Sequence, residues 1–568
     1  MKRISTVTFL SIILAIAALP SAAQDRQGGD DDAMLPEIDP QDIEIRSEFK
    51  ARFPGLRRQP ILGFEPASRT YSVDPDRMPY IESREEVVAD LPISELTRPD
   101  PPAYTQLHYS PDINAFGRLG AGSYVSPEAT FWGVTRLNEK SYIGGDLDLS
   151  SSEGHLDNQK SSFRFLNADA EFATKLDDDT RLGFDLGLEN SFNHLYGIES
   201  TALSIPDSPR KEYGGFNLGA DLQRLKNGVA GWNVQANMRY YEARVYAGDL
   251  AGMTDEGVYN ASLSKRWAGA HPQEMITAKL GGTLGDYNNS ITADQWMTGQ
   301  AGVEYQRLFN YEMNLTVDAS VYYGSNAFEE KVYFGPTATI ELPIFEGAIL
   351  TGEIGAKPYV QTAEDLHSTN RFLSSGNDFR HTYRMYGAGE LELKYSEVGS
   401  LSGGIRYEDI SNQPVFERNA LSSQPDELLF YRVRYADATR VRIYAGASHQ
   451  VVPEKFWLHG KAYAQLPELK DGGRVPFSEK LGLNSGFGLR LFDRATIEGW
   501  ADYRGLRKND QGQNLNDYLL LGGQLDLLIT DNIGVYAKVV NLLDQEYQKW
   551  EGYVERPMQI YGGVTFKL

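Results

Sequence analysis

The C-terminal stretch of the chain, residues 541–568, reads NLLDQEYQKWEGYVERPMQIYGGVTFKL. In its final part, apolar or small residues alternate with polar ones, as they do in a strand whose two faces meet different surroundings. One face of this strand would carry Met558, Ile560, Gly562, Val564, Phe566 and Leu568. Because this strand is apolar on one face and ends the sequence, it is predicted to close an outer-membrane β-barrel by pairing with the first strand.

The opposite end of the chain predicts export. Lys2 and Arg3 precede a largely apolar run over residues 7–19, and small residues follow up to Ala23. This pattern is typical of a Sec signal peptide over residues 1–23, because the apolar run is too short to span a bilayer comfortably. We therefore expect the mature protein in the outer membrane of a Gram-negative cell.

Composition limits the function classes. The chain has no Cys, which excludes disulfides, thiolate metal sites and a Cys nucleophile. Its 55 Gly and 33 Tyr are typical of a barrel, which needs tight corners and aromatic girdles. The net charge of −23 argues against a nucleic-acid partner, because phosphate binding needs a basic surface.

Alternating stretches continue through the middle of the chain, for example at residues 143–149, 166–172, 182–188 and 216–222. A soluble β-sandwich or propeller can show the same alternation, but in lipid only a closed barrel satisfies the backbone hydrogen bonds of strands. We mark about 22 strands over residues 105–568, within a range of roughly 20 to 24. The predicted fold class is therefore all-β, a transmembrane antiparallel β-barrel.

Two long connections are predicted at about residues 363–382 and 412–427. We expect both to be extracellular, because outer loops are longer than periplasmic turns. A circle of about 22 strands encloses a lumen that is wide enough to need filling. The N-terminal segment, inward loops or another protein would have to fill it.

The segment between the signal peptide and the barrel, residues 24–104, is acidic at its start and then rich in Pro. Pro at this density interrupts helices and sheet ladders, so a largely irregular periplasmic segment is predicted. Large apolar residues recur from residue 43 onwards. The segment would be a free tail, a partial occlusion of the lumen, or a contact for a periplasmic or outer-membrane protein partner.

Eight residues near the C-terminus form a recurrent motif: Asn541, Leu542, Asp544, Tyr547, Gly552, Tyr553, Pro557 and Gly563. They resemble the C-terminal region of TonB-dependent receptors, in which an N-L-x-D-x-x-Y element precedes the last hairpin and a G-G pair lies in the closing strand. Residues 116–197 are similar to the receptor-like barrels of Bacteroidota. The resemblance implies a receptor-type barrel. It also implies a folded plug, which residues 24–104 are too short and too Pro-rich to form, and it leaves TonB as an uncertain partner.

Catalytic patterns are missing from the sequence. The eight His are scattered, and neither H-E-x-x-H, G-x-S-x-G nor a phosphate-binding G-x-x-x-x-G-K-[ST] occurs. We therefore predict no enzyme, no cofactor and no metal site.

Two functions stay open. The first is solute passage or uptake across the outer membrane, through a lumen whose acidic residues favour cations or neutral sugars over anions. The second is a non-transporting scaffold that binds partners through residues 24–104. In both cases the partners include outer-membrane lipid and, during biogenesis, the barrel-assembly machinery.

Overall fold

The computed structural model describes residues 115–157, 160–196, 209–226, 230–247, 250–271, 273–289, 293–309, 313–325, 330–377, 379–418, 431–492 and 494–568. The predicted signal peptide and the segment 24–104 lie outside these residues. What the sequence predicts for them stays a prediction.

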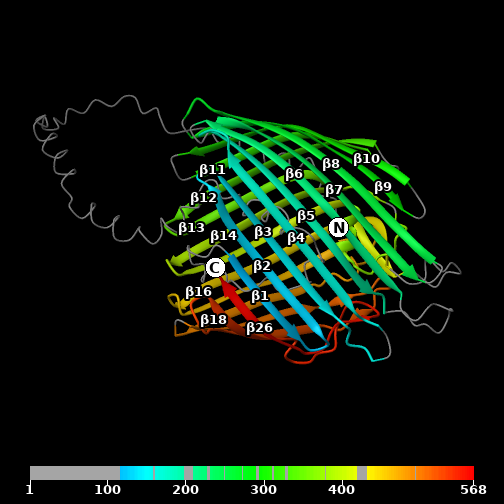
Figure 1. Ribbon diagram of the computed structural model, residues 1–568. Coiled ribbons are helices and arrows are strands. Elements are labelled where there is room, and N and C mark those ends of the chain that lie inside the picture. The colour runs from blue at the N-terminus through cyan, green and yellow to red at the C-terminus, as the bar shows by residue number, and fades with distance from the viewer. Residues whose placement is uncertain are drawn as a thin grey trace, which may run out of the picture. The chain divides into compact units, whose positions relative to one another are not determined.

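The described chain forms a closed antiparallel barrel of 22 strands (Figure 1). This confirms the all-β barrel and the number of strands predicted from the alternation. The barrel strands are β1 (Ala115–Gly122), β2 (Ser126–Asn138), β3 (Ser141–Ser152), β4 (Phe163–Lys175), β5 (Thr180–His194), β6 (Arg210–Lys226), β7 (Ala230–Ala247), β8 (Leu250–Ala268), β9 (Glu274–Asn289), β10 (Ala293–Phe309), β11 (Met313–Ser325), β12 (Glu330–Phe345), β13 (Ala348–Tyr359), β14 (Thr382–Ser396), β15 (Gly399–Arg418), β16 (Tyr431–Val452), β17 (Phe456–Leu469), β18 (Leu481–Leu491), β19 (Ala495–Gly505), β22 (Tyr518–Leu528), β23 (Ile533–Val540) and β26 (Gln559–Lys567).

The remaining elements are short and lie in the connections. Two small hairpins pair β20 (Arg507–Lys508) with β21 (Asn514–Leu515), and β24 (Gln548–Trp550) with β25 (Tyr553–Val554). The helix α6 (Ala363–Thr369) lies between β13 and β14. None of the helices formed by the described residues has the length and apolar character needed to cross a membrane.

The barrel closes where β26 pairs with β1, with Gly563 opposite Gly120. Both glycines lie beside the ring of Tyr536, and an ideal Cβ on Gly120 would fall 1.9 Å from its hydroxyl oxygen. On the outer face, the ring of Phe566 covers Gly117 in the same way. Aromatic rings packed over glycines therefore form this seam, an arrangement that fixes strand register.

The two faces of each strand meet different surroundings. On β9, Leu280 and Leu284 are 60% and 54% exposed on the outside, whereas Thr277 is buried on the lumen side. On β26, Ile560 and Val564 face outwards, and Tyr561 and Thr565 are buried. An apolar outer face and a polar inner face are what a barrel in lipid requires.

The connections differ between the two ends of the barrel. At the end that holds the start of β1 and the end of β26, tight turns such as residues 346–347 and 397–398 join the strands. We call this the turn end. At the other end, the loop end, the connections include residues 153–162, 360–381, 470–480, 506–517 and 541–558.

One predicted connection is wrong in its position. The sequence predicts a loop from residue 412, but β15 runs on to Arg418 and pairs with β16 up to Tyr431. A register shift between Ile410 and Gln413 allows this, with Asn412 at φ 56°. Such a β-bulge inserts an extra residue without ending the strand, so residues typical of a turn do not end it here. The rest of the predicted loop, residues 419–427, lies outside the described residues.

Candidate functional site: a loop lid inside the barrel

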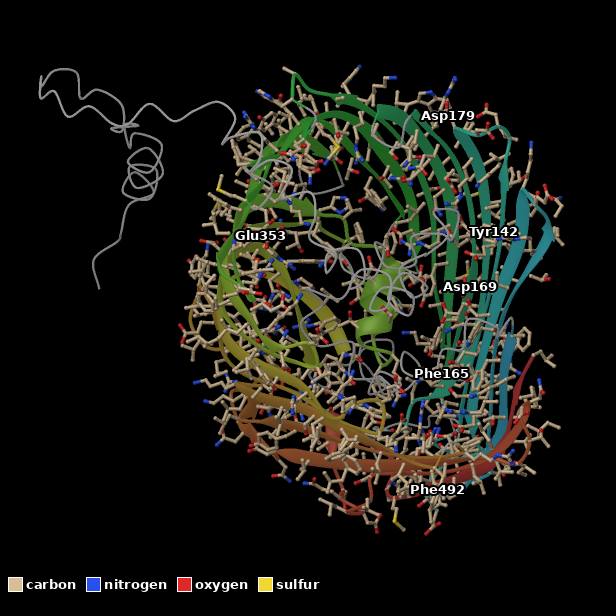
Figure 2. The ribbon with its side chains drawn as sticks, turned by 90° about the vertical axis from the view of Figure 1, so that its left-hand side faces the viewer. Tyr142, Phe165, Asp169, Asp179, Glu353 and Phe492 are labelled. Carbon is tan, nitrogen blue, oxygen red and sulfur yellow. The ribbon has the colours of Figure 1, made fainter. Side chains whose placement is uncertain are left out.

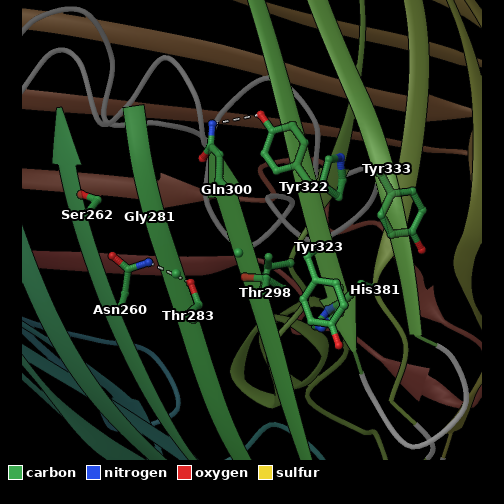
Figure 3. Close-up of a pocket in the computed structure, with 15 residues that line it drawn as sticks. Asn260, Ser262, Gly281, Thr283, Thr298, Gln300, Tyr322, Tyr323, Tyr333 and His381 are labelled. Atoms are coloured by element: carbon green, nitrogen blue, oxygen red, sulfur yellow. Dashed lines mark hydrogen bonds between the residues drawn. The ribbon is translucent and has the colours of Figure 1, made fainter. Parts of the chain in front are cut away.

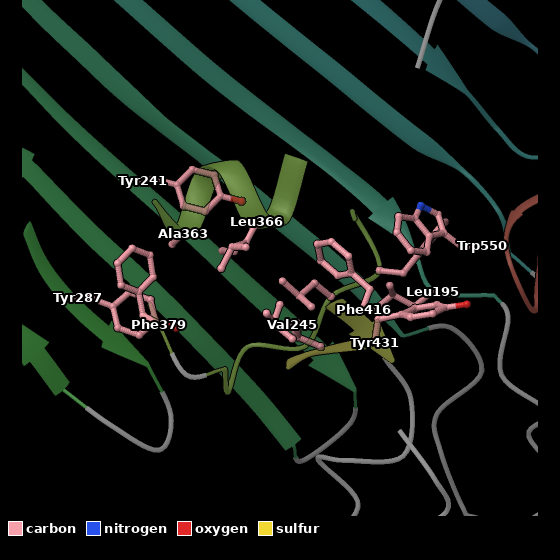
Figure 4. Packing of buried hydrophobic residues seen from close by; sticks show 14 of the residues in the cluster. Leu195, Tyr241, Val245, Tyr287, Ala363, Leu366, Phe379, Phe416, Tyr431 and Trp550 are labelled. Carbon is pink, nitrogen blue, oxygen red and sulfur yellow. The ribbon is translucent and has the colours of Figure 1, made fainter. Parts of the chain in front are cut away.

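Loops from the loop end fold into the lumen and pack together there. Figure 2 shows helix α6 inside the ring of strands. The largest contributions come from residues 360–381 and 541–558, which we call the lid. Its core is a cluster of buried apolar residues (Figure 4), among them Leu366, Phe372, Leu373, Phe379, Tyr431, Phe477, Trp550 and Tyr553.

Local sequence explains the helix of the lid. Thr362 is the N-cap and accepts a hydrogen bond from the backbone N–H of Asp365, whose carboxylate accepts from the backbone N–H of Thr362. This capping box satisfies two donors that the first turn would otherwise leave unpaired. A helix this short is unstable in water on its own, so contacts with the barrel must hold it in place.

The barrel wall holds both ends of this segment. At the start of α6, the backbone N–H of Ala363 donates to the Glu256 carboxylate on β8 over 2.6 Å, and Trp296 Nε1 donates to the same carboxylate over 2.8 Å. Beyond the helix, Lys211 Nζ on β6 donates to the carbonyl oxygens of Arg371 and Leu373 over 3.3 and 3.2 Å. Glu256 and Lys211 are almost fully buried, so these contacts fix the segment against two separate strands.

Residues 374–377 make further hydrogen bonds with the barrel wall. Thr254 Oγ1 donates to the Ser375 carbonyl over 2.6 Å, and Tyr287 OH donates to the Asn377 carbonyl over 3.1 Å. The Asn377 side chain accepts from the backbone N–H of Val433 on β16 over 3.0 Å. The segment thus bonds to β8, β9 and β16 without joining the sheet as a strand.

The second part of the lid, residues 541–558, meets the first through stacked rings. The ring centres of Phe372 and Tyr553 lie 3.5 Å apart, and the angle between the two ring planes is 15°. Trp550 packs against Tyr431 and Phe477, which come from β16 and from the connection between β17 and β18. Segments from well-separated parts of the barrel wall therefore share one aromatic core.

Side chains from other parts of the chain hold the backbone of residues 541–558. His155 Nε2 and Tyr196 OH each lie 3.0 Å from the carbonyl oxygen of Val554. Tyr431 OH donates to the carbonyl of Glu551 over 2.8 Å. Arg507 donates to the carbonyls that precede Trp550. The carbonyl groups of this inward hairpin thus find partners away from water.

An ion pair links the two parts of the lid. Arg371 donates to both carboxylate oxygens of Glu555 at 3.2 Å, and its guanidinium lies 4.9 Å from the centre of the Phe372 ring. Burial by itself would raise the pKa of Glu555, but the positive charges of Arg371, Lys549 and Arg556 outweigh it and lower that pKa below its ordinary value. The Glu555 carboxylate therefore stays ionised at neutral pH and holds the two loops together.

This pair predicts a pH dependence. A carboxylate whose pKa is lowered in the folded state stabilises that state above its ordinary pKa of about 4.3, and the stabilisation is lost as the pH falls through the lowered value. We expect hydrogen exchange of residues 541–558, corrected for its intrinsic pH dependence, to accelerate below about pH 4.

The variant Glu555→Gln should exchange faster already at neutral pH, by roughly tenfold to a hundredfold, because it loses about 1.5–3 kcal/mol of charged hydrogen bonding. Its exchange should also change less between pH 5 and 3 than that of the parent protein. The matched control is Glu546→Gln, an exposed carboxylate of the same loop. Equal behaviour of the two variants would contradict the role of Glu555.

The motif residues near the C-terminus have different places in the structure. Asn541 is buried, and its side chain bonds the backbone N–H and carbonyl of Gln545, while Asp544 accepts from the backbone N–H of Met558. Asn541 and Asp544 both have positive φ, so they shape the entry to the 541–558 loop.

The other motif residues lie in the lid, at the surface or in the seam. Tyr553 belongs to the lid core, Gly552 has a φ of 87° in the turn before it, and the Tyr547 ring lies 4.9 Å from that of Tyr518. Leu542 is exposed, Pro557 leads into β26, and Gly563 lies in the closing seam.

Sequence reasoning missed Lys211, Glu256 and Arg371. The first two lie on inward faces of alternating strands, where a polar residue is expected whatever its role. Arg371 lies in a connection whose inward path cannot be read from composition. Only the capping box of α6, with Thr362 and Asp365, could have indicated structure in this loop.

The described residues contain no group of three or more His, Cys, Asp or Glu placed to hold a metal ion. The site geometry is that of packed loops joined by hydrogen bonds and ion pairs.

The fold and this site define a class of protein, the large transmembrane barrel with loops folded into its lumen. No protein-family description matches the chain, and no curated protein does. Among solved structures, FpvA of Pseudomonas aeruginosa bound to pyoverdines has a TM-score of 0.62 and 12% identity, over 80% of this chain and 72% of FpvA. The ferric-catecholate import receptor Fiu of Escherichia coli K12 has a TM-score of 0.60 and 10% identity, over 80% of this chain and 82% of Fiu.

The FrpB iron transporter of Neisseria meningitidis is also similar, with a TM-score of 0.63 and 9% identity, over 82% of this chain and 83% of FrpB. At such identities the likeness shows the fold. The resemblance to the barrels of TonB-dependent receptors, which the C-terminal motif predicted, is confirmed at this level.

Proposed function

We propose that this protein passes solutes across the outer membrane through its lumen, and that the lid is the gate. The end with long loops would face the cell exterior, because outer-membrane barrels have short periplasmic turns and longer extracellular loops. The similar solved structures carry the names of receptors and transporters, which supports transport over catalysis.

The observation that carries this proposal is how the lid is attached. Its segments are bound to the wall by discrete contacts such as those of Glu256, Lys211 and Thr254, and they are not strands of the barrel. Such a segment can leave the wall while the 22 strands stay paired. Binding and catalytic loops are often of this kind, since they lie at the low end of local stability.

The inner wall below the lid suits polar solutes. On β4, β5 and β6 the lumen side carries Asp169, Asp185 and Asp221 in neighbouring positions. Acidic walls favour cations and neutral molecules over anions by their electrostatic field. We therefore expect inorganic anions to be the poorest permeants.

The test uses the natural absence of Cys. In the double variant Thr254→Cys and Ser375→Cys, a disulfide would join the lid to β8 where Thr254 Oγ1 lies 2.6 Å from the backbone carbonyl oxygen of Ser375. A disulfide contributes about 2–4 kcal/mol, enough to reduce lid opening by more than about tenfold. Each single variant serves as a control.

Conductance of the purified barrel in planar lipid bilayers provides the measurement, with full-length protein and with residues 24–104 deleted. We expect openings in the reduced double variant and their loss on oxidation. If deletion of residues 24–104 is needed before openings occur, that segment also occludes the lumen. Silence of both forms, reduced and oxidised, would overturn transport and leave the scaffold role, in which a filled barrel holds partners.

A further inference from the structure

A pocket of about 270 Å³ lies inside the barrel, between the inner wall and the lid (Figure 3). Strands β8 to β12 form its floor, and the end of β13 and the lid residues Val360 and His381 border it. Its size is close to the lower limit of ligand pockets, roughly 300 Å³. It is therefore large enough for a small ring and too small for a large chelate.

The lining of this pocket is polar but uncharged. Hydroxyl and amide groups of Asn260, Thr283, Gln300 and Tyr322 surround it, and no Asp, Glu, Lys or Arg is among the described residues that line it. Figure 3 shows two of their mutual hydrogen bonds, from Asn260 to Thr283 and from Gln300 to Tyr322, at 2.8 and 3.2 Å. A charged ligand would find no counter-charge here, whereas a neutral ligand with many hydroxyl groups would find donors and acceptors.

The absence of charge is local. Further along the same strands, Lys279 binds Glu304 and Asp318 at 2.6 and 3.0 Å. This cluster has one positive and two negative charges, and none of its three residues lines the pocket. The inner wall thus separates a charged layer from an uncharged one.

One polar group on the pocket has no partner among the described residues. His381 is 5% exposed, and neither of its ring nitrogens has a hydrogen-bond partner in that part of the chain. The ring is held by aromatic contacts, 4.9 Å from Trp296 and 5.2 Å from Phe379 between ring centres. Because burial lowers the pKa of His381 to about 4, the imidazole is neutral and offers one donor and one acceptor. A buried polar group left without a partner is costly, and a ligand hydroxyl would satisfy it.

The floor of the pocket leaves room for a flat molecule. Gly281 faces the lumen on β9, and an ideal Cβ there would meet only ordinary contacts, at 3.4 Å from the Cβ of Ser262. The rings of Tyr322 and Tyr333 border the same space. Aromatic rings beside hydroxyl and amide groups suit a molecule with apolar ring faces and a polar edge.

We propose that this pocket binds one unit of a neutral carbohydrate, an uncharged polyhydroxylated ring. The inference rests on the proposed function, since it names the substrate class of the same lumen. The Tyr rings would cover the CH face of the sugar, and Asn260, Gln300 and His381 would bond its hydroxyl groups.

Two adjacent glycines provide a matched test. Gly281→Leu would fill the pocket, because its side chain points into the lumen. Gly282 also lines the pocket, but only with its backbone. The side chain in Gly282→Leu would lie on the outer face between the exposed Leu280 and Leu284, where a Cβ would meet only the Thr298 carbonyl at 3.4 Å. Folding of each variant is checked by its resistance to unfolding in SDS without heating.

Saturation-transfer NMR of the full-length protein in detergent measures binding. The probes are D-glucose and D-galactose, with D-glucuronate and D-glucosamine as their charged counterparts. We expect saturation transfer to a neutral hexose. This transfer should fall at least about fivefold in Gly281→Leu and stay unchanged in Gly282→Leu. His381→Ala should weaken binding, by roughly tenfold if one hydrogen bond of about 1.5 kcal/mol is lost.

Several outcomes would overturn the pocket as a sugar site. They are equal binding to Gly281→Leu and Gly282→Leu, stronger binding of a charged sugar, or no transfer to any probe. This experiment does not require the lid to open in a bilayer. If no sugar binds but the lid still gates conductance, only the proposed substrate class is wrong. If a sugar binds but no conductance is seen, only the transport proposal is wrong.

Discussion

Replacing Gly563 by Val is expected to prevent closure of the barrel. Gly563 lies opposite Gly120 in the pairing of β26 with β1. An ideal Cβ on Gly563 would fall 2.1 Å from the Leu119 carbonyl oxygen and 2.6 Å from Gly120 Cα. Both are backbone atoms of the strand that must pair, so no side chain can move aside to relieve the clash. Overpacking costs about 1–3 kcal/mol and more where the backbone must shift, which predicts a loss of closed barrel of roughly tenfold to a hundredfold or more.

The neighbouring residue provides the control. Gly562 faces outwards, and a Cβ there would meet only the Tyr536 carbonyl at 3.7 Å, so Gly562→Val should close normally. Closure is measured by the compact migration of unheated protein in SDS gels and by the amount of protein in the outer membrane. Equal assembly of the two variants would show that the seam does not depend on this close approach.

Much of the barrel could be predicted from the sequence because its physics is local. Alternation of Ile560, Gly562 and Val564 with polar neighbours identifies a strand between lipid and lumen without knowledge of any other strand. Repetition of this pattern, with the even-number rule, led to the number of strands that the structure has. The same reasoning failed at Asn412, where a bulge continues β15 through residues that are typical of a turn.

The lid could not be predicted because its contacts are remote in sequence. More than 150 positions separate Lys211 from Leu373, and the same is true of Phe372 and Tyr553. The members of each pair meet only after the barrel has closed. An inward-facing Glu on a strand looks the same whether it faces water or the start of a helix. Closure of the barrel therefore decides which inward polar residues become anchors.

Replacing Glu256 by Ala is expected to release the first part of the lid. Its carboxylate accepts hydrogen bonds from the backbone N–H of Ala363 and from Trp296 Nε1, and it is 1% exposed. A buried donor without an acceptor costs about 1–3 kcal/mol, and the variant leaves two such donors unpaired. We therefore expect the docking of α6 to weaken by about 3 kcal/mol, which raises its opening equilibrium roughly a hundredfold.

A second acidic residue of the same site serves as the control. Glu364 on α6 pairs with Arg239 at 3.0 Å, but both side chains are about one third exposed, so Glu364→Ala should cost at most about 1 kcal/mol. Hydrogen exchange of residues 360–377 measures the opening, and bilayer conductance of the same preparations measures its consequence. Faster exchange with matching openings in Glu256→Ala would make α6 the movable part of the gate. Faster exchange without openings would place the barrier elsewhere in the lumen, because the wall contact of α6 would then be broken while the passage stayed closed.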